Sequence, residues 1–161
     1  MKKRNYFPMF FDISQKRILV VGGGTIATRR IKTLLKFTDH LTVIAPDFSE
    51  ELQQLKENKK FNGLVFLHQP FTEETEKMLD QMDLVFTATD CTELNQRIVA
   101  LCHEKHVLVN TADDKRACDF FFPSVIEKEG IVIGMNSGGE NPGKVKRLRE
   151  ALEQMLCNFR I

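Results

Sequence analysis

The chain has 161 residues, the size of one ordinary domain, which is enough to bury a core without disulfides or a structural metal. Its 23 Lys and Arg residues nearly balance 22 Asp and Glu residues, and the net charge of +1 argues against a general nucleic-acid-binding protein. No apolar run approaches the roughly 20 residues of a membrane span, and the four cysteines have neither metal-site nor disulfide spacing, so we expect a cytoplasmic protein without a bound metal.

Short apolar, β-branched runs alternate with segments of helical spacing from the start of the chain to about residue 109. The runs predict strands at 17–21, 41–45, 64–67, 84–88 and 107–109. The segments between them predict helices at 26–37, 49–58, 73–82 and 93–105. This alternation favours an α/β fold with a Rossmann-type, doubly wound parallel sheet.

The pattern changes after Asn110. Residues 120–126 and 130–135 predict two strands joined by a polar turn at 127–129, and a helix is expected from Pro142, since proline is favoured at the first helical position. A hairpin and a helix are too small to fold alone. We therefore expect a Rossmann domain at 1–113 and a tail at 114–161 that packs on it, on a second subunit, or on both.

A glycine-rich segment lies between the first predicted strand and helix. Gly22-Gly23-Gly24-Thr25-Ile26-Ala27 matches G-x-G-x-x-G/A, in which the first glycine makes a tight turn and the second admits a pyrophosphate. The N–H groups that begin the helix add a partial positive charge. We expect a dinucleotide at Gly22, Gly23, Gly24, Thr25 and Ile26, and the alternative is a purely structural glycine turn.

An acidic residue after the second strand of such a fold binds the ribose hydroxyls of NAD. Asp47 follows Pro46 at the end of that predicted strand, so we expect both residues at the cofactor and NAD rather than NADP. The alternative for Asp47 is a helix cap, a role for which Ser49 competes. Arg29 and Arg30 are the cations nearest in sequence for a 2′-phosphate, but we expect them to be solvated.

Thr89 and Asn95 border the loop after the fourth predicted strand. Side chains in such a loop reach the ribose or nicotinamide of a bound cofactor, and we expect both residues there. The alternative is structural, with Thr89 ending a strand and Asn95 lying in the first turn of a helix.

Further motifs extend over nearly the whole chain. They lie at 7–13, 21–30, 43–46, 88–90, 110–113, 119–123 and 137–142. In this order they resemble the precorrin-2 dehydrogenase family, which includes the dehydrogenase module of siroheme synthases. The resemblance implies oxidation of precorrin-2 to sirohydrochlorin, in which NAD+ takes a hydride and protons leave the macrocycle. It also implies a homodimer built through residues 119–161.

Asp113 matches the family aspartate regarded as catalytic. A carboxylate at the carboxyl edge of a parallel strand can take or orient a proton. Without the resemblance, Asp113 would be interpreted as a solvated turn residue.

A polycarboxylate tetrapyrrole substrate requires cations and N–H donors. Our candidates are Lys115, Arg116, Ser137, Gly138, Lys144 and Arg147. The alternative for the cations is a solvated helix face, which we favour for Lys146 and Arg149. Two other functions stay open: an enzyme that also inserts Fe2+ into sirohydrochlorin, and a non-catalytic NAD- or tetrapyrrole-binding sensor, against which the presence of Asp113 argues.

Overall fold

The computed structural model describes residues 6–57 and 61–157, and the chain divides into two compact units. Residues 12–120 form the sheet unit, and residues 6–11 with 121–157 form the hairpin unit. The division falls after Phe120 rather than after Asp113, because the segment leading to Phe120 stays bonded to the sheet. The Asp119 N–H donates to the Val109 carbonyl at 3.0 Å, and Asn110 Nδ2 donates to the Phe120 carbonyl at 2.6 Å.

The sheet unit contains parallel strands in the order β3-β2-β1-β4-β5. They are β1 (Ile18–Val21), β2 (Leu41–Ala45), β3 (Leu64–His68), β4 (Leu84–Thr87) and β5 (Leu108–Thr111). This order confirms the predicted Rossmann-type sheet, and the order reverses between β1 and β4, where such folds bind ligands. β5 continues past the expected end at Val109, because Thr111 pairs in register with Thr87.

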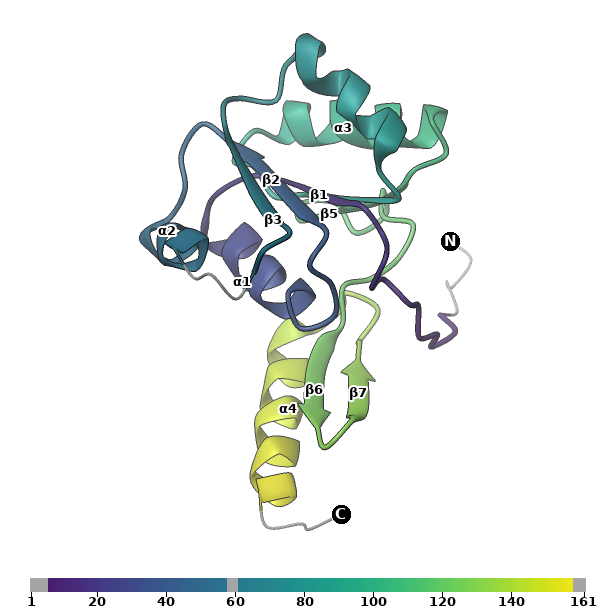
Figure 1. Ribbon diagram of the computed structural model, residues 1–161. Coiled ribbons are helices and arrows are strands. Elements are labelled where there is room, and N and C mark those ends of the chain that lie inside the picture. Colours follow the sequence, from purple (N-terminus) through teal and green to yellow (C-terminus); the bar gives the residue numbers. More distant parts are fainter. Residues whose placement is uncertain (1–5, 58–60, 158–161) are drawn as a thin grey trace. The chain divides into compact units, whose positions relative to one another are not determined.

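Helices cover both faces of this sheet, as Figure 1 shows for α1 (Thr25–Leu34) and α2 (Glu50–Glu57) on one face and α3 (Thr92–Glu104) on the other. The α3 face holds a core cluster that includes Val21, Val85 and Val109 from the sheet and Leu79 and Ile98 from the covering helices. The doubly wound arrangement is therefore confirmed. None of the described helices has the length and apolarity that a membrane span requires.

The expected helix at 73–82 is a 3₁₀ helix, η1 (Glu73–Gln81). At its start the Thr75 N–H donates to the Thr72 carbonyl, and at its end the Met82 N–H donates to the Leu79 carbonyl. Both hydrogen bonds reach back three residues, as in a 3₁₀ helix. Leu79 is the one buried residue of the segment, so packing does little to impose the α-helical spacing. The apolar pattern alone could not distinguish the two helix types.

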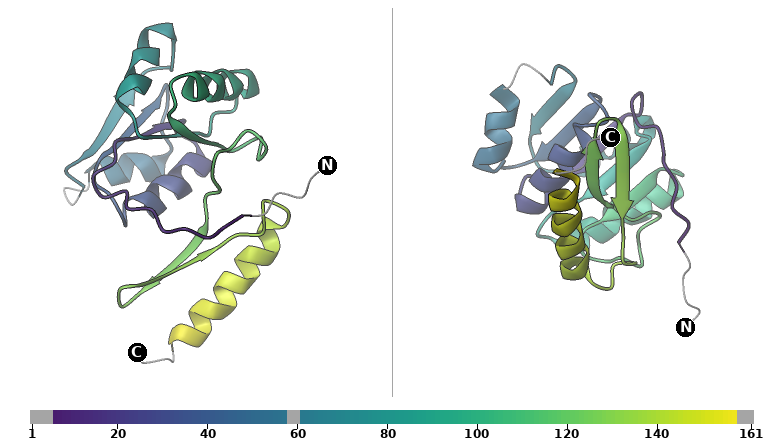
Figure 2. Two further views of the ribbon diagram at one scale, coloured as in Figure 1. Left: turned by 90° about the vertical axis from the view of Figure 1, so that its right-hand side faces the viewer. Right: turned by 90° about the horizontal axis from the view of Figure 1, so that it is seen from below.

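The hairpin unit contains β6 (Ser124–Lys128), β7 (Ile131–Met135) and α4 (Pro142–Cys157), and Figure 2 shows α4 running beside the two strands. The helix start at Pro142 is confirmed, but the first strand begins later than predicted, since Pro123 has no N–H to donate. The turn is also shorter than 127–129. It consists of Glu129 and Gly130 with φ of 51° and 80°, the positive values of a tight hairpin turn.

Candidate functional site

The glycine turn between β1 and α1 packs against the ends of two neighbouring strands. Gly22 has a φ of +126°, and a Cβ there would lie 2.3 Å from the Ala88 carbonyl oxygen after β4. A Cβ on Gly23 would lie 2.0 Å from the Asp47 carbonyl oxygen after β2. Glycine is therefore required at both positions. The sequence motif gave Gly23 no separate role, and the structure shows that it lets the backbone of Asp47 reach the turn.

Gly24 is different because its missing side chain leaves open space. Apart from its chain neighbours, no described residue has an atom within 4 Å of the position that its Cβ would take. Gly24, Thr25 and Ile26 are exposed, and within the described chain no side chain caps α1 and no acidic residue stands in its first turn. The first N–H groups of α1 and their partial positive charge thus fit a pyrophosphate.

Ser49, rather than Asp47, caps α2. Ser49 Oγ accepts a hydrogen bond from the Leu52 N–H at 3.3 Å and lies 2.8 Å from Thr28 Oγ1 on α1. The Asp47 side chain is exposed, and among the described residues no hydrogen bond or ion pair engages its carboxylate. Capping therefore does not account for Asp47, and its carboxylate is available to a ligand beside the glycine turn.

A surface depression of about 440 Å³ adjoins the starts of α1 and α2. Thr25, Thr28 and Ser49 line it with hydroxyl groups, and Glu50 and Glu51 add carboxylates. Lys32 forms an ion pair with Glu51. The depression is thus polar and more acidic than basic.

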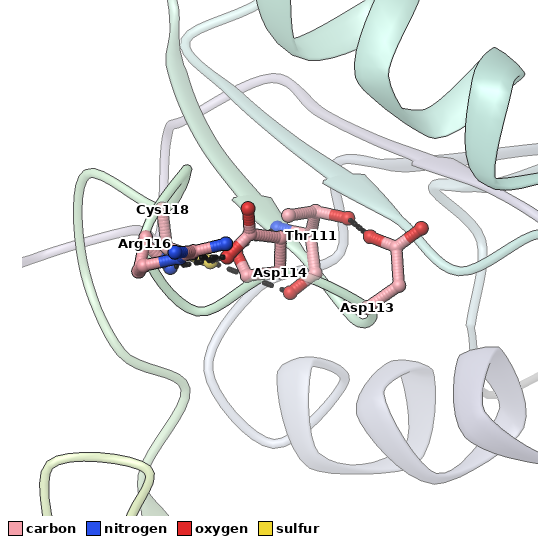
Figure 3. Close-up of polar contacts among 5 residues, drawn as sticks. All are labelled: Thr111, Asp113, Asp114, Arg116 and Cys118. Carbon is pink, nitrogen blue, oxygen red and sulfur yellow. Dashed lines mark hydrogen bonds and ion pairs between the residues drawn. The ribbon is translucent and has the colours of Figure 1, made fainter.

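Asp113 follows the end of β5, at the carboxyl edge where the glycine turn also lies. Thr111 Oγ1 donates a hydrogen bond to one carboxylate oxygen (Figure 3), and Asn95 Nδ2 donates to the other at 2.9 Å. Partial burial raises the pKa of this carboxyl group, but hydrogen bonds from Thr111, Asn95 and the backbone N–H groups of Asp113 and Asp114 together outweigh it and hold the pKa below its usual range. Asp113 is therefore ionised at neutral pH and can accept a proton.

Asn95 is buried in the first turn of α3, with 1% of its surface exposed. Its Oδ1 accepts hydrogen bonds from the Thr89 N–H at 3.3 Å and Thr89 Oγ1 at 2.8 Å. Its Nδ2 donates to the Thr89 carbonyl at 3.1 Å and to Asp113. These contacts use both donors and both acceptor positions of the amide. In this arrangement the Asn95 amide is fully used within the protein, and Thr89 is linked to Asp113 through it. The expected proximity of both residues to the cofactor stays a prediction.

The loop after Asp113 is held by its own polar contacts, drawn in Figure 3. Asp114 Oδ1 accepts hydrogen bonds from the Arg116 N–H at 2.8 Å and from Arg116 Nε at 3.3 Å. Cys118 Sγ accepts from the Thr111 N–H at 3.3 Å and faces the Thr111 carbonyl at the same distance. Burial raises the pKa of the Cys118 thiol. Arg116, expected at the substrate, is thus engaged by Asp114, and no sequence motif pointed to Cys118.

Arg30 is buried, although we expected it to be solvated. Only 9% of its surface is exposed, its Nη1 donates to the Thr87 carbonyl at 3.4 Å, and its guanidinium carbon lies 5.9 Å from the centre of the Phe86 ring. Burial lowers its pKa to about 10, so it keeps its charge at neutral pH, and it interacts electrostatically with Cys118 and Asp113. Its spacing from the buried Ala27 on α1 was the signal that sequence reasoning missed.

In the hairpin unit, Ser137 and Gly138 form the turn that precedes α4. Ser137 Oγ accepts a hydrogen bond from the Asn141 N–H at 3.0 Å, and Asn141 Oδ1 caps the helix through the Lys144 N–H at 2.8 Å. Gly138 has a φ of +66°. The Ser137 hydroxyl hydrogen stays available as a donor.

The cations of α4 differ in their surroundings. Lys146 and Arg149 form ion pairs with Glu150 and Glu153. Among the described residues no ion pair engages Lys144 or Arg147, which are also exposed. Lys115 is an exposed residue of the sheet unit. A search of the described residues for three or more clustered His, Cys, Asp or Glu side chains finds no candidate metal site.

Comparisons with known proteins agree with this geometry. Residues 9–124 match the family described as "Putative NAD(P)-binding". The chain is 38% identical over 152 residues to siroheme synthase of Zymomonas mobilis, covering 94% of this chain and 31% of that protein. It is 40% identical over 152 residues to siroheme synthase of Saccharophagus degradans, with 94% and 32% covered. It thus spans about a third of these relatives. The solved structure of "SirC, precorrin-2 dehydrogenase" matches with a TM-score of 0.73 at 25% identity, covering 93% of this chain and 70% of that one.

Proposed function

The chain belongs to the NAD(P)-binding family and is a homologue of siroheme synthases, and we propose that it catalyses the NAD+-dependent oxidation of precorrin-2 to sirohydrochlorin. The observation that carries the proposal is the arrangement at one sheet edge. The open start of α1 at Gly24 and the ionised Asp113 both follow carboxyl ends of strands in the same parallel sheet. The similarity to SirC supports the choice of substrate.

The chain's own groups fit the cofactor. The N–H groups at Gly24, Thr25 and Ile26 would hold the pyrophosphate, since they are exposed and uncapped. Asp47, beside Pro46, would accept hydrogen bonds from the ribose hydroxyls. Bound NAD+ supplies a nicotinamide ring that accepts a hydride.

Asp113 is the proposed proton acceptor of the reaction. Removing a hydride from precorrin-2 leaves a cationic macrocycle that must lose a proton, and an ionised carboxylate can take it. Its low pKa is consistent with this role, because the group is unprotonated before the reaction. The positive charge of Arg30 also favours the ionised form of Asp113.

We propose NAD rather than NADP as the preferred cofactor. A 2′-phosphate would replace one ribose hydroxyl that Asp47 is suited to bind and would meet its negative charge. Glu50 and Glu51, which line the adjoining depression, would add to the repulsion.

Lys144 and Arg147 are the proposed partners of the substrate carboxylates in the hairpin unit. Intrahelical ion pairs occupy Lys146 and Arg149 but engage neither of these two within the described chain. Lys115 stays a proposal as a cation and Ser137 as a hydroxyl donor. Gly138 and Arg116 are the weaker candidates, because the Gly138 N–H donates to Asn136 Oδ1 and Asp114 holds Arg116.

A homodimer is proposed through residues 119–161. Within the described part of α4 no residue is buried, and Leu148 and Met155 are 52% and 69% exposed. A second copy of the chain would cover such a face. A cytoplasmic location is proposed as well, and the four free cysteines are consistent with it.

The proposed activity is tested by following NADH formation from NAD+ and precorrin-2. We expect turnover by the parent chain and a loss of at least about a hundredfold in kcat for Asp113→Asn, since positioned acid–base groups contribute about 10²- to 10⁴-fold. Asp114→Asn is the matched control, because it removes a neighbouring carboxylate that contacts Arg116 instead. NAD+ binding should be retained in both variants.

Two results would contradict the proposal. If the parent binds NAD+ and precorrin-2 without forming NADH, the chain is a sensor rather than an enzyme. If Asp113→Asn and Asp114→Asn are equally active, Asp113 is a turn residue and another group accepts the proton.

A further inference from the structure

The amide of Asn95 joins two parts of the sheet unit that the proposed reaction requires together. One is the loop after β4, which it holds through Thr89, and the other is the Asp113 carboxylate after β5. We infer that Asn95 is a positioning residue that fixes the Asp113 carboxylate relative to the loop after β4. This inference rests on the proposed function for its effect on turnover.

The hydrogen-bond pattern has a defined direction. Asn95 Oδ1 accepts from the Thr89 N–H and Nδ2 donates to the Thr89 carbonyl, so the side-chain amide pairs with Thr89 as a peptide group pairs with a neighbouring strand. This pairing decides that Nδ2, and not Oδ1, faces the Asp113 carboxylate at 2.9 Å. Burial of Asn95 prevents water from replacing the amide.

Other charged and titratable groups also act on Asp113. Arg30 on α1 contributes a positive charge, Asp114 in the same loop contributes a negative one, and the Cys118 thiol lies in the loop that Thr111 anchors. None of these is altered by a substitution at Asn95. A change in the Asp113 titration on substituting Asn95 therefore reports the contact between the two side chains.

Asn95→Asp is the sharpest test because it keeps the shape and changes a donor into an acceptor. A carboxylate oxygen would replace Nδ2 beside both the Thr89 carbonyl and the Asp113 carboxylate. Two carboxylates in contact share a proton, and the pair then titrates with one strongly raised pKa. Asn95→Ala removes the donor without adding a charge, and the merely structural alternative, in which Asn95 only holds the start of α3, predicts that this variant leaves the Asp113 titration unchanged.

The experiment uses the full chain and two measurements. The first is the titration of the Asp113 carboxyl carbon by NMR in ligand-free protein with isotope-labelled aspartate, assigned by the signal missing in Asp113→Asn. The second is the pH profile of kcat for NADH formation from precorrin-2. Gln96→Glu, the next residue on α3, is the matched control, because it adds the same negative charge on an exposed side chain.

For Asn95→Asp we expect the apparent pKa at which the Asp113 signal titrates to rise by at least about one unit. The acidic limit of kcat should rise by a similar amount, and kcat at neutral pH should fall about 10- to 100-fold, while the NAD+ Kd stays within a few-fold. Gln96→Glu should leave all of these unchanged. If Asn95→Asp does not fold, Asn95→Ala replaces it, and we expect the pKa of Asp113 to rise through the lost hydrogen bond.

The NMR titration separates failure of this inference from failure of the proposed function. An Asp113 titration that is the same in the parent and in the folded Asn95 variant overturns the positioning role, whatever the activity. A large loss of NAD+ binding without a change in that titration also overturns it and returns Asn95 to cofactor binding. If the titration shifts but the parent does not oxidise precorrin-2, the positioning role stands and the proposed substrate is wrong.

Discussion

At the scale of single residues, the hydrogen bonds and the electrostatic surroundings of the Asp113 carboxylate come from side chains of other elements. Asn95 and Thr111 donate to its two oxygens, and Arg30 is buried nearby with its charge. The family resemblance, rather than the local sequence pattern, pointed to Asp113, and neither predicted these contacts, because hydrogen-bond partners depend on how strands end in three dimensions. Asn95 was noticed for its position after β4, and Arg30 was assigned to the solvent although it lies on the buried face of α1.

Asp47 is the main residue to which we assign the proposed preference for NAD over NADP. We expect Asp47→Asn to bind NADP+ at least about tenfold more tightly than the parent, because the negative charge that opposes a 2′-phosphate is removed. NAD+ should bind more weakly as its ribose contacts lose the charged acceptor. Calorimetric titration of both cofactors measures the two effects.

The control for this substitution is Asp39→Asn. Asp39 is an exposed aspartate that precedes β2, at the opposite end of the strand from Asp47. Asp39→Asn therefore removes one negative charge away from the proposed cofactor site. If both variants shift NADP+ binding equally, general electrostatics rather than Asp47 sets the preference.

At the scale of elements, the sequence predicted the sheet well and the connections poorly. Apolar β-branched runs such as Ile18–Val21 are long enough and buried enough that pattern alone determines a strand. By contrast, η1 and the start of β6 depend on packing and on turn geometry. The positive φ of Glu129 sets the length of the hairpin turn, and the missing N–H of Pro123 sets the start of β6. Only the second of these can be predicted from a sequence.

Asp83 joins the starts of two central strands. Its N–H donates to the Arg17 carbonyl at 2.9 Å, and its Oδ2 accepts from the Arg17 N–H at 2.8 Å. That backbone hydrogen bond is the main reason that the pKa of Asp83 lies below 3.8. We expect Asp83→Ala to lower the free energy of unfolding by about 1 kcal/mol at neutral pH.

The pH dependence of this effect follows from the direction of the shift. Because the folded-state pKa is lower than the unfolded one, the carboxylate stabilises the fold above about pH 4 and loses this effect as the pH falls through the folded value. Denaturant unfolding should therefore show parent and Asp83→Ala converging in acid. Asp80→Ala, which removes an exposed ion pair with Lys105, is expected to change stability little.

The hairpin turn supplies a test of β6 and β7. Gly130 has a φ of +80°, so Gly130→Ala is expected to destabilise the chain by about 1 kcal/mol and lower its Tm. Gly143→Ala is the control, since a Cβ there lies 3.7 Å from its nearest neighbour and α4 favours alanine. Equal Tm values for the two variants would contradict the turn geometry.

At the scale of the whole molecule, the two units differ in how completely they bury their apolar residues. The sheet unit has a continuous core that includes Val21, Val85 and Ile98. In the hairpin unit, Ile131, Leu148 and Met155 are 47%, 52% and 69% exposed. An isolated hairpin and helix of this kind gain little from burial. The proposed homodimer would supply the missing contacts.

Leu148 and Met155 lie two turns apart on the same face of α4, so a pair of substitutions there tests the dimer directly. In sedimentation at micromolar concentration, the parent should have twice the chain mass of 18.6 kDa. The double variant Leu148→Glu, Met155→Glu should have the mass of a single chain, because burying two carboxylates opposes association. Gln154→Glu adds a charge at an exposed polar position of the same helix and should stay dimeric. Since NAD+ is proposed to bind within the sheet unit, its Kd should be similar in all three proteins. A dimeric double variant would place the interface elsewhere, and a monomeric parent would mean that the exposed face of α4 serves another partner.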